Sequence, residues 1–228
     1  MKCWICGAEA DSREHLIKAS DMRTFFGNIS AQTPVFLHTN KRRNIPLHSA
    51  KTNKIKTENK VICCRCNDTE TAAYDNAWSD LLNYLHANWN LIKTNRRIKL
   101  HKVFPGNVKK QALYFHLYFV KLFGCRIVDE NMPIDISEFS KSVREGIPHK
   151  TVYLTFNYRT LNNSKAFYAG PSEVHAKEYN GKCEMATWYY TLGELDIQIS
   201  WFNKEPMRNI PKAWNPERSG KIVSFRPR

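Results

Sequence analysis

The chain has 228 residues, of which 42% are hydrophobic and 25% are charged, a balance that is ordinary for a globular protein with a substantial core. Its 35 Lys and Arg residues outnumber its 21 Asp and Glu residues, which gives a formal net charge of +14. Such an excess favours a polyanionic partner, nucleic acid first and an acidic membrane surface second. The first residues lack the apolar region of a secretory signal, and the most apolar run, 112–123, is interrupted by His116 and Lys121. We therefore expect a cytoplasmic protein without a membrane span or a membrane partner.

Four of the seven cysteines form two Cys-x-x-Cys pairs that lie far apart in the sequence. The pairs are Cys3 with Cys6 and Cys63 with Cys66, and Gly7 suits the tight turn that the first pair needs. Each pair can place two thiolates on one tetrahedral ion, so together they predict a structural Zn²⁺ site. A chain without a secretory signal is expected in a reducing compartment, which favours metal binding over disulfides. The alternative is a set of unpaired thiols.

A basic segment with few large apolar residues extends from residue 39 to residue 60. Its cations face a single acid, Glu58. The cations considered for binding are Lys41, Arg42, Arg43, Lys51, Lys54 and Lys56. Two interpretations stay open, because a charge run is usually a solvated face but this one lies inside the loop that the zinc site would close. It is either such a face or a surface that binds nucleic-acid phosphates.

The clearest helix follows Cys66 and runs to about Trp89, with Asn67 or Asp68 as its N-cap. Its apolar residues recur at helical spacing and are expected to form a buried stripe of Tyr74, Trp78, Leu81 and Leu85. A zinc knuckle, a basic ribbon and this helix make a small ββα unit. Pro105-Gly106 breaks the chain, so we expect one domain over residues 1–104 and an α+β domain over residues 105–228.

In the second domain, a helix is expected over 109–123, with Gly124 ending it. Another is expected to begin at Asp135 or Ser137 and to reach Glu145. Alternating patterns over 151–158 and 195–201 then predict strands of an antiparallel sheet with one buried face. Turn signals stand at Asn162-Asn163 and Asn180-Gly181. The basic tail, 221–228, is expected to be loose.

An acid–histidine pair, Glu14-His15, lies between the two cysteine pairs, and Asn67 directly follows the second pair. A phosphodiesterase needs a base that deprotonates water and a cation that stabilises the developing charge. His15 suits the first role, because an imidazole pKa near ~6.5 leaves it mostly neutral at cellular pH. Glu14 and Asn67 offer the hard oxygen ligands that Mg²⁺ or Mn²⁺ prefers. Asp75 is either a further carboxylate of that site or an acid that favours the helix N-terminus.

These residues resemble the HNH endonucleases of the ββα-metal superfamily, in the version that carries a Cys₄ zinc site. The resemblance covers residues 3–90. It implies that His15 is the general base and that Glu14 and Asn67 hold the catalytic divalent ion. It also implies products with 5′-phosphate and 3′-hydroxyl ends.

Two positions depart from the family pattern. Asn59 is the match for the family's middle asparagine, but it lies four residues before Cys63, where the family more often has five. Lys18 stands where family members often carry a proline, and there it could reach a phosphate.

The sequence therefore predicts a metal-dependent DNA endonuclease, with RNA as the other possible substrate and with a role in defence against foreign DNA. The expected fold is α+β: an N-terminal zinc-clamped ββα-metal domain, a helical segment and an antiparallel β-sheet domain. One alternative is a non-catalytic, zinc-stabilised module that binds nucleic acid through the same basic surface. Another is an interaction subunit whose C-terminal sheet docks on a regulatory partner such as an ATPase.

Overall fold

The computed structural model describes residues 1–37, 44–159, 168–206 and 210–228. Its helices are α1 (Ala19–Phe26), α2 (Ala72–Ala87), α3 (Trp89–Asn95), α4 (Leu100–Val103), α5 (Val108–Asp129) and α6 (Ser137–Glu145). A 3₁₀ turn covers Asn53–Ile55, and a π-helical segment, Arg65–Glu70, leads into α2. None of the helices in these ranges combines the length and the apolar character that crossing a membrane requires.

A large mixed sheet makes the protein an α+β fold. Its strands are β1 (Val35–Leu37), β2 (Ile45–Leu47), β3 (Arg97–Lys99), β4 (Val152–Tyr158), β5 (Tyr168–Pro171), β6 (His175–Tyr179), β7 (Lys182–Leu192), β8 (Leu195–Phe202) and β9 (Ile222–Pro227). They follow the order β2-β1-β5-β7-β8-β4-β9-β3, and β6 pairs with β7. Two pairs, β1–β5 and β4–β9, are parallel, so the expectation of a purely antiparallel sheet is wrong. Parallel partners are joined by long connections, which turn signals between adjacent strands do not reveal.

Both halves of the chain build this sheet. Strands β1, β2 and β3 precede residue 105, and two of them pair with β5 and β9 from the second half. The tail over 221–228 is not loose as expected, because it forms β9 between β4 and β3. Val223 and Phe225, two residues apart, are both buried there. This alternation of buried and more exposed side chains explains why a basic segment forms a strand. The domain boundary at residue 105 stays a prediction, but the two ranges share one sheet and one core.

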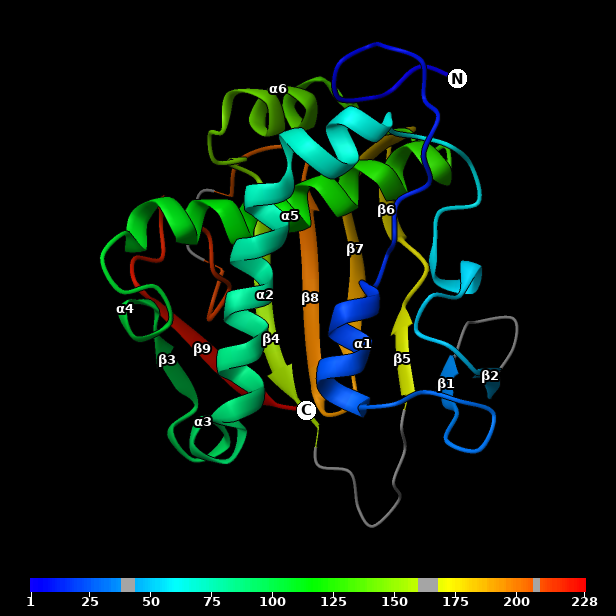
Figure 1. The fold of residues 1–228 in the computed structure, drawn as a ribbon. Helices are drawn as coiled ribbons and strands as arrows, with labels where there is room; N and C mark the ends of the chain where they lie inside the picture. Colours follow the sequence, from blue (N-terminus) through cyan, green and yellow to red (C-terminus); the bar gives the residue numbers. More distant parts are fainter. Residues whose placement is uncertain (38–43, 160–167, 207–209) are drawn as a thin grey trace.

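Helices α1, α2 and α5 lie over one face of the sheet (Figure 1). The stripe predicted for α2 is confirmed, since Tyr74, Trp78, Leu81 and Leu85 are all buried. Trp78 stacks on Tyr118 of α5 with ring centroids 5.5 Å apart, which joins the two halves of the chain in the core. Helix α2 begins at Ala72, later than expected, because the residues after Cys66 form the π-helical segment.

Helix α5 continues through Gly124 to Asp129, so the prediction that Gly124 ends the helix is wrong. The glycine serves a close approach instead. A Cβ at this position would lie 2.5 Å from Cη2 of Trp4, whose ring rests against the helix. The Trp4 indole also donates a hydrogen bond to Cys125 Sγ at 3.3 Å. The first cysteine pair, which flanks Trp4, is thereby fixed on α5.

Polar side chains on the other face of the central strands are covered as well. Strand β4 is buried along its whole length, so the sheet does not have a single buried face as expected. Thr191 Oγ1 donates to Asp196 Oδ1 at 2.7 Å, and the hydroxyls of Thr187 and Ser200 lie 3.1 Å apart. Asp196 also pairs with Arg228. These groups satisfy one another, which permits their burial.

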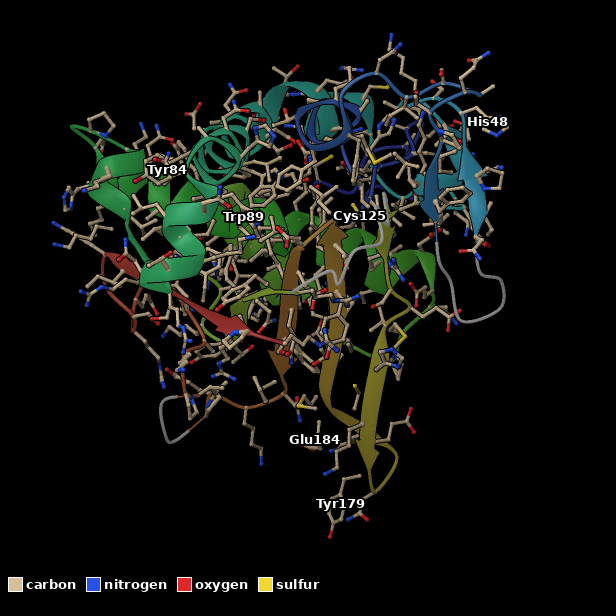
Figure 2. The ribbon with its side chains drawn as sticks, turned by 90° about the horizontal axis from the view of Figure 1, so that it is seen from below. His48, Tyr84, Trp89, Cys125, Tyr179 and Glu184 are labelled. Carbon is tan, nitrogen blue, oxygen red and sulfur yellow. The ribbon has the colours of Figure 1, made fainter. Side chains whose placement is uncertain are left out.

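Strands β6 and β7 form a hairpin whose turn projects beyond the central strands of the sheet (Figure 2). Asn180 and Gly181 connect them with φ angles of 51° and 71°, so the turn predicted there is confirmed. Strand β6 is exposed along its length, and Tyr179 is 68% exposed. Figure 2 shows Tyr179 at the far end of this hairpin, away from the body of the fold. The turn predicted at Asn162-Asn163 lies outside the described residues.

Candidate metal centre and active-site cleft

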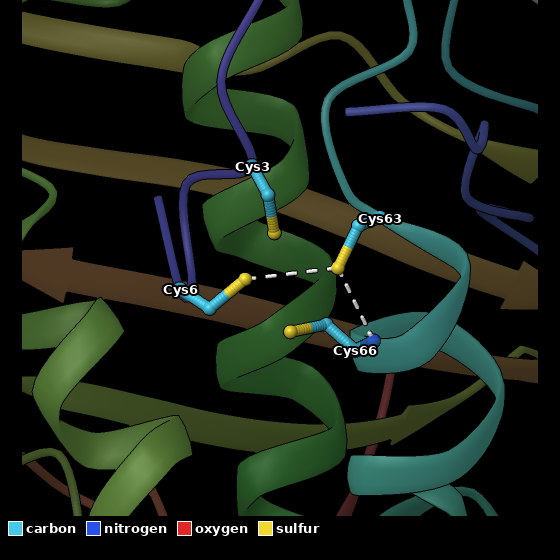
Figure 3. A group of neighbouring side chains, drawn as sticks. All are labelled: Cys3, Cys6, Cys63 and Cys66. Atoms are coloured by element: carbon cyan, nitrogen blue, oxygen red, sulfur yellow. Dashed lines mark hydrogen bonds between the residues drawn. The ribbon is translucent and has the colours of Figure 1, made fainter. Parts of the chain in front are cut away.

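The two Cys-x-x-Cys pairs meet at one point. The sulfur atoms of Cys3, Cys6, Cys63 and Cys66 all lie within 4.8 Å of one another (Figure 3). Cys6 Sγ is 3.7 Å from Cys63 Sγ, and the backbone N–H of Cys66 donates to Cys63 Sγ at 3.4 Å. The turn after the first pair is tight, since Gly7 has a φ of 77° and donates its N–H to Cys3 O at 2.8 Å. The predicted four-cysteine cluster is therefore confirmed.

This cluster could bind a metal ion such as Zn²⁺. Zinc with thiolate bonds of about 2.3 Å forms a tetrahedron whose edges are about 3.8 Å, which is close to the sulfur separations here. Three of the cysteines are buried and Cys6 is exposed. A hydrogen bond from the backbone of Ala8 lowers the pKa of Cys6 to about 7 and so favours the thiolate form that binds metal. The donor set fits zinc.

Two extended segments run side by side next to this cluster. Leu16 donates its N–H to Ile55 O at 2.8 Å, and Thr57 donates its N–H to Glu14 O at 2.9 Å. The Thr57 hydroxyl accepts the N–H of Glu14 at 3.1 Å, and His15 forms an isolated antiparallel bridge with Lys56. These bonds fix the backbone of the acid–histidine pair.

A cleft of about 430 Å³ opens beside this pair, between α1, α2 and α5. Five of the predicted site residues line it: Glu14, His15, Lys18, Asn67 and Asp75. The other lining residues are Ala19, Ser20, Arg23, Asp68, Ala72, Asn76 and Lys121. The fold thus gathers residues that follow the first cysteine pair, residues that follow the second pair, and Lys121 of α5 around one cavity.

A buried lysine of α5, Lys121, binds the acidic side chains of the cleft. Its Nζ is 3.3 Å from Glu14 Oε2 and 3.1 Å from Asp75 Oδ2. Thr71 Oγ1 at 3.2 Å and Asn67 Oδ1 at 3.5 Å complete its surroundings. Burial disfavours the charge of Lys121, but Glu14 and Asp75 outweigh burial and raise its pKa above the ordinary value. The ammonium is therefore charged in the folded protein.

A second ammonium, that of Lys18, pairs with Asp75 as well. Lys18 Nζ lies 3.5 Å from Asp75 Oδ1, and it donates to Asp75 O at 3.0 Å and to Ser79 Oγ at 2.9 Å. The carboxylates of Glu14 and Asp75 (−2) and the two ammonium groups (+2) thus sum to zero. Burial raises the pKa of Glu14 although Lys121 opposes this. Glu14 Oε2 accepts no hydrogen bond from the described residues, so its contact with Lys121 is a charge pair without hydrogen-bond geometry.

A catalytic Mg²⁺ or Mn²⁺ does not fit this arrangement. Mg²⁺ takes oxygen ligands at about 2.0–2.1 Å in an octahedron. Here the oxygens of Glu14, Asn67 and Asp75 already surround an ammonium group. A doubly charged ion ~4 Å from the Lys121 ammonium would be repelled by roughly 8 kcal/mol at an effective dielectric constant of ~20. Glu14 and Asp75 are already paired with Lys121 and Lys18, so these two carboxylates have no net negative charge left to offset that repulsion.

His15 is half-buried at the same cleft. Burial lowers its pKa, and the charges of Lys56 and Lys121 lower it further, so the ring is neutral at neutral pH. The described part of the chain supplies no hydrogen bond to the ring nitrogens. A neutral imidazole can accept a proton from a water molecule in the cleft.

Helix α1 forms a wall of the cleft and is anchored through Asp21. This carboxylate is buried, and it accepts hydrogen bonds from Trp78 Nε1 at 2.8 Å and from the Tyr190 hydroxyl. Arg23 on the same helix is exposed and lines the cleft, and no acid among the described residues pairs with it. Arg23 is thus a cation available to a phosphate.

Comparison with known proteins gives no match. No family model fits the chain, and neither the curated proteins nor the solved structures contain a similar one. The interpretation of the site therefore depends on its own geometry.

Other predicted site residues lie away from the cleft. Asn59 is exposed, and its N–H and side-chain amide donate to Asp129 Oδ1 of α5 at 2.8 Å and 3.1 Å. Lys51 and Lys54 are exposed and Lys56 is half-buried, and none of the three lines the cleft. The remaining cations of the basic segment, Lys41, Arg42 and Arg43, lie outside the described residues.

Sequence reasoning missed Lys121 and Arg23 as members of the site. The signal for Lys121 was present, because a lysine inside the most apolar run of the chain must find acidic partners once that run is buried. No such signal marks Arg23, since an exposed arginine on a short helix fits any solvated surface.

Proposed function

We propose that the cleft hydrolyses phosphodiester bonds of nucleic acid. DNA is the expected substrate and RNA is the alternative. The observation that carries the proposal is that Glu14, His15 and Asn67, which flank the two cysteine pairs, line one cleft. A neutral imidazole and the cation of Arg23, neither of which has a partner among the described residues, share that cleft. The formal charge of +14 supports a polyanionic substrate.

In the proposed reaction, His15 takes a proton from a water molecule, and the water oxygen attacks phosphorus. The bond between phosphorus and the 3′ oxygen breaks, and that oxygen takes up a proton from solvent. The products carry 5′-phosphate and 3′-hydroxyl ends, as the resemblance implies. Arg23 binds a phosphate oxygen and so helps to place the reacting group. A Mg²⁺ or Mn²⁺ ion on Glu14 and Asn67, although implied by the resemblance, has no part in these steps.

The ββα-metal assignment of the N-terminal part belongs to the same proposal. It is supported by the two extended segments and the helix α2 beside the cysteine cluster. A structural Zn²⁺ would hold the two cysteine pairs together and take no part in the chemistry. Defence against foreign DNA, a cytoplasmic location and a regulatory partner such as an ATPase stay predictions from the sequence.

Replacement of His15 tests the proposal. In zinc-loaded protein, His15→Ala is expected to slow plasmid cleavage by ~10²–10⁴-fold, the usual contribution of a general base. Zinc content, melting temperature and duplex binding should stay close to wild type. His48→Ala is the matched control, because His48 is exposed and lies outside the cleft. A His15→Ala protein that cuts as fast as wild type per folded molecule would refute the role of His15.

The buried pair between Glu14 and Lys121 favours a second candidate function. Because this pair gives Glu14 a structural role, the protein could be a zinc-stabilised module that binds nucleic acid without cutting it. A wild-type protein that binds duplex DNA but cuts neither DNA nor RNA, with or without added Mg²⁺ or Mn²⁺, would support this candidate.

A further inference from the structure

We propose that the ammonium of Lys121 takes the place of the catalytic divalent ion, so that the cleft binds neither Mg²⁺ nor Mn²⁺. Any part that Lys121 plays in hydrolysis rests on the proposed function, whereas the occupancy of the site can be tested without it. Lys121 belongs to α5 and therefore lies outside residues 3–90, which carry the resemblance. The second half of the chain thus completes the site.

The ammonium contacts each side chain that would ligate the ion. Glu14, Asn67 and Asp75 all present an oxygen to Nζ, at 3.1–3.5 Å. Thr71 supplies a fourth oxygen at 3.2 Å, and its hydroxyl donates to Cys66 O at 2.9 Å, which leaves its lone pairs free for Lys121. These four oxygens form a cage around Nζ. The hydrogen bond from Thr71 to Cys66 O connects the cage to the cysteine cluster.

Charge balance favours the same conclusion. With Lys18 and Lys121 present, the carboxylates of Glu14 and Asp75 are neutralised. Without Lys121, the cluster of Glu14, Asp75 and Lys18 would carry a net charge of −1. Oxygen ligands with excess negative charge are what a hard divalent ion selects. Loss of Lys121 leaves this excess charge and also empties the position between the oxygens of Glu14, Asn67 and Asp75.

Lys121 is 1% exposed, so it acts as a positioning residue. It orients the side chains of Glu14, Asn67 and Asp75 along the cleft wall. It also places a fixed positive charge next to the position where a phosphate would bind. A preorganised charge of this kind stabilises developing negative charge without the need to recruit an ion.

Binding of Mn²⁺, followed by electron paramagnetic resonance, tests the proposal on the zinc-loaded full chain with and without a short DNA duplex. Mn²⁺ does not displace Zn²⁺ from four thiolates, because sulfur sites bind it far more weakly. Wild type is expected to bind no Mn²⁺ that depends on Glu14. Lys121→Met is expected to gain one site, which Glu14→Gln in the same background removes. Lys18→Met makes the same charge change beside Asp75 and should gain none, since Lys121 still fills the cage.

A single Mn²⁺ in wild type that Glu14→Gln abolishes would overturn the proposal, as would equal binding by Lys18→Met and Lys121→Met. If Lys121→Met does not fold, the comparison of wild type with Glu14→Gln decides alone. Cleavage is measured separately in zinc-loaded protein freed of other divalent ions. Cutting that persists there supports the proposal, whereas cutting that requires added Mg²⁺ overturns it. A protein that cuts nothing refutes the proposed function, and the Mn²⁺ titration still decides the role of Lys121.

Discussion

Replacement of Gly124 by alanine should reveal how tightly the segment of the first cysteine pair is held on α5. Inside a helix, this change normally stabilises a protein by about 1 kcal/mol, because alanine has the higher helix propensity. Here the added Cβ would lie 2.5 Å, 2.6 Å and 2.9 Å from three ring carbons of Trp4. Ordinary carbon contacts are about 3.5–4.0 Å, so the ring or the helix must shift by about 1 Å. We expect the opposite sign at this position.

The size of the effect follows from two opposing contributions. Overpacking of a well-filled core typically costs about 1–3 kcal/mol, and a clash with three atoms of a rigid ring belongs at the upper end. After subtraction of the propensity gain, Gly124→Ala should lower the free energy of unfolding by about 2 kcal/mol. For a chain of this size that corresponds to a fall in melting temperature of about 4–8 °C. Zinc affinity should fall too, since Trp4 lies between Cys3 and Cys6.

The sign of the effect should reverse when the ring is removed. Trp4→Leu keeps an apolar side chain but lacks the three ring carbons that the new methyl group would meet. In that background, Gly124→Ala should stabilise the protein by about 1 kcal/mol, which gives a coupling of about 3 kcal/mol between the two positions. Urea unfolding of the four zinc-loaded proteins measures the cycle, and competition with a chromophoric chelator measures zinc affinity. Equal effects of Gly124→Ala in both backgrounds would refute the close approach.

Three further predictions concern the cysteine cluster, the basic segment and a buried histidine. Cys66→Ser should lose zinc and melt earlier, because binding of about 10 kcal/mol is linked to the folding of structural zinc sites; elemental analysis and calorimetry check this, and an unchanged melting temperature contradicts it. Replacement of the exposed Lys51 and Lys54 by alanine should reduce the salt slope of duplex binding by roughly 0.9 for each phosphate that the variant no longer binds. An unchanged slope would mean that this segment is only a solvated face. Burial lowers the pKa of His116 to about 3, so the unfolded chain takes up this proton first as the pH falls. The stability that neutral His116 contributes is complete above pH ~6.5 and is lost as the pH falls towards ~3, by roughly 2 kcal/mol at pH ~5. Urea titrations of wild type and His116→Phe at neutral pH and near pH ~5 check this. Wild type should lose roughly 2 kcal/mol more unfolding free energy between the two pH values than His116→Phe loses. An equal loss in both proteins would contradict the lowered pKa of His116 in the folded protein.

Patterns that act over a few residues were predictable from the sequence. The buried stripe of α2 follows from helical spacing, and the β6–β7 turn follows from Asn180-Gly181, whose φ angles suit a two-residue connection. The meeting of the two cysteine pairs was predictable for a chemical reason, since one tetrahedral ion needs four donors. The convergence of Glu14, His15 and Asn67 on one cleft is consistent with that frame.

Features that depend on distant partners were not predictable in the same way. Strand β9 is hard to recognise in a basic tail, because its pairing with β3 and β4 joins residues that are far apart in the chain. Gly124 resembles a helix stop when only its neighbours are considered, since the ring that explains it belongs to Trp4, at the other end of the core. Lys121 gave a local signal, but its partners Glu14 and Asp75 could be named only once the helices were placed.

The dependence of the cleft on α5 gives the protein an order of assembly during synthesis. The ribosome delivers the chain from its N-terminus, so all four cysteines emerge before any residue of α5. A nascent chain can therefore bring its four cysteines together while Glu14 still lacks the lysine that neutralises it. The cleft is complete only after the long helix has left the exit tunnel and has packed against α2. A chain that stops before residue 108 would thus carry all four cysteines but lack Lys121.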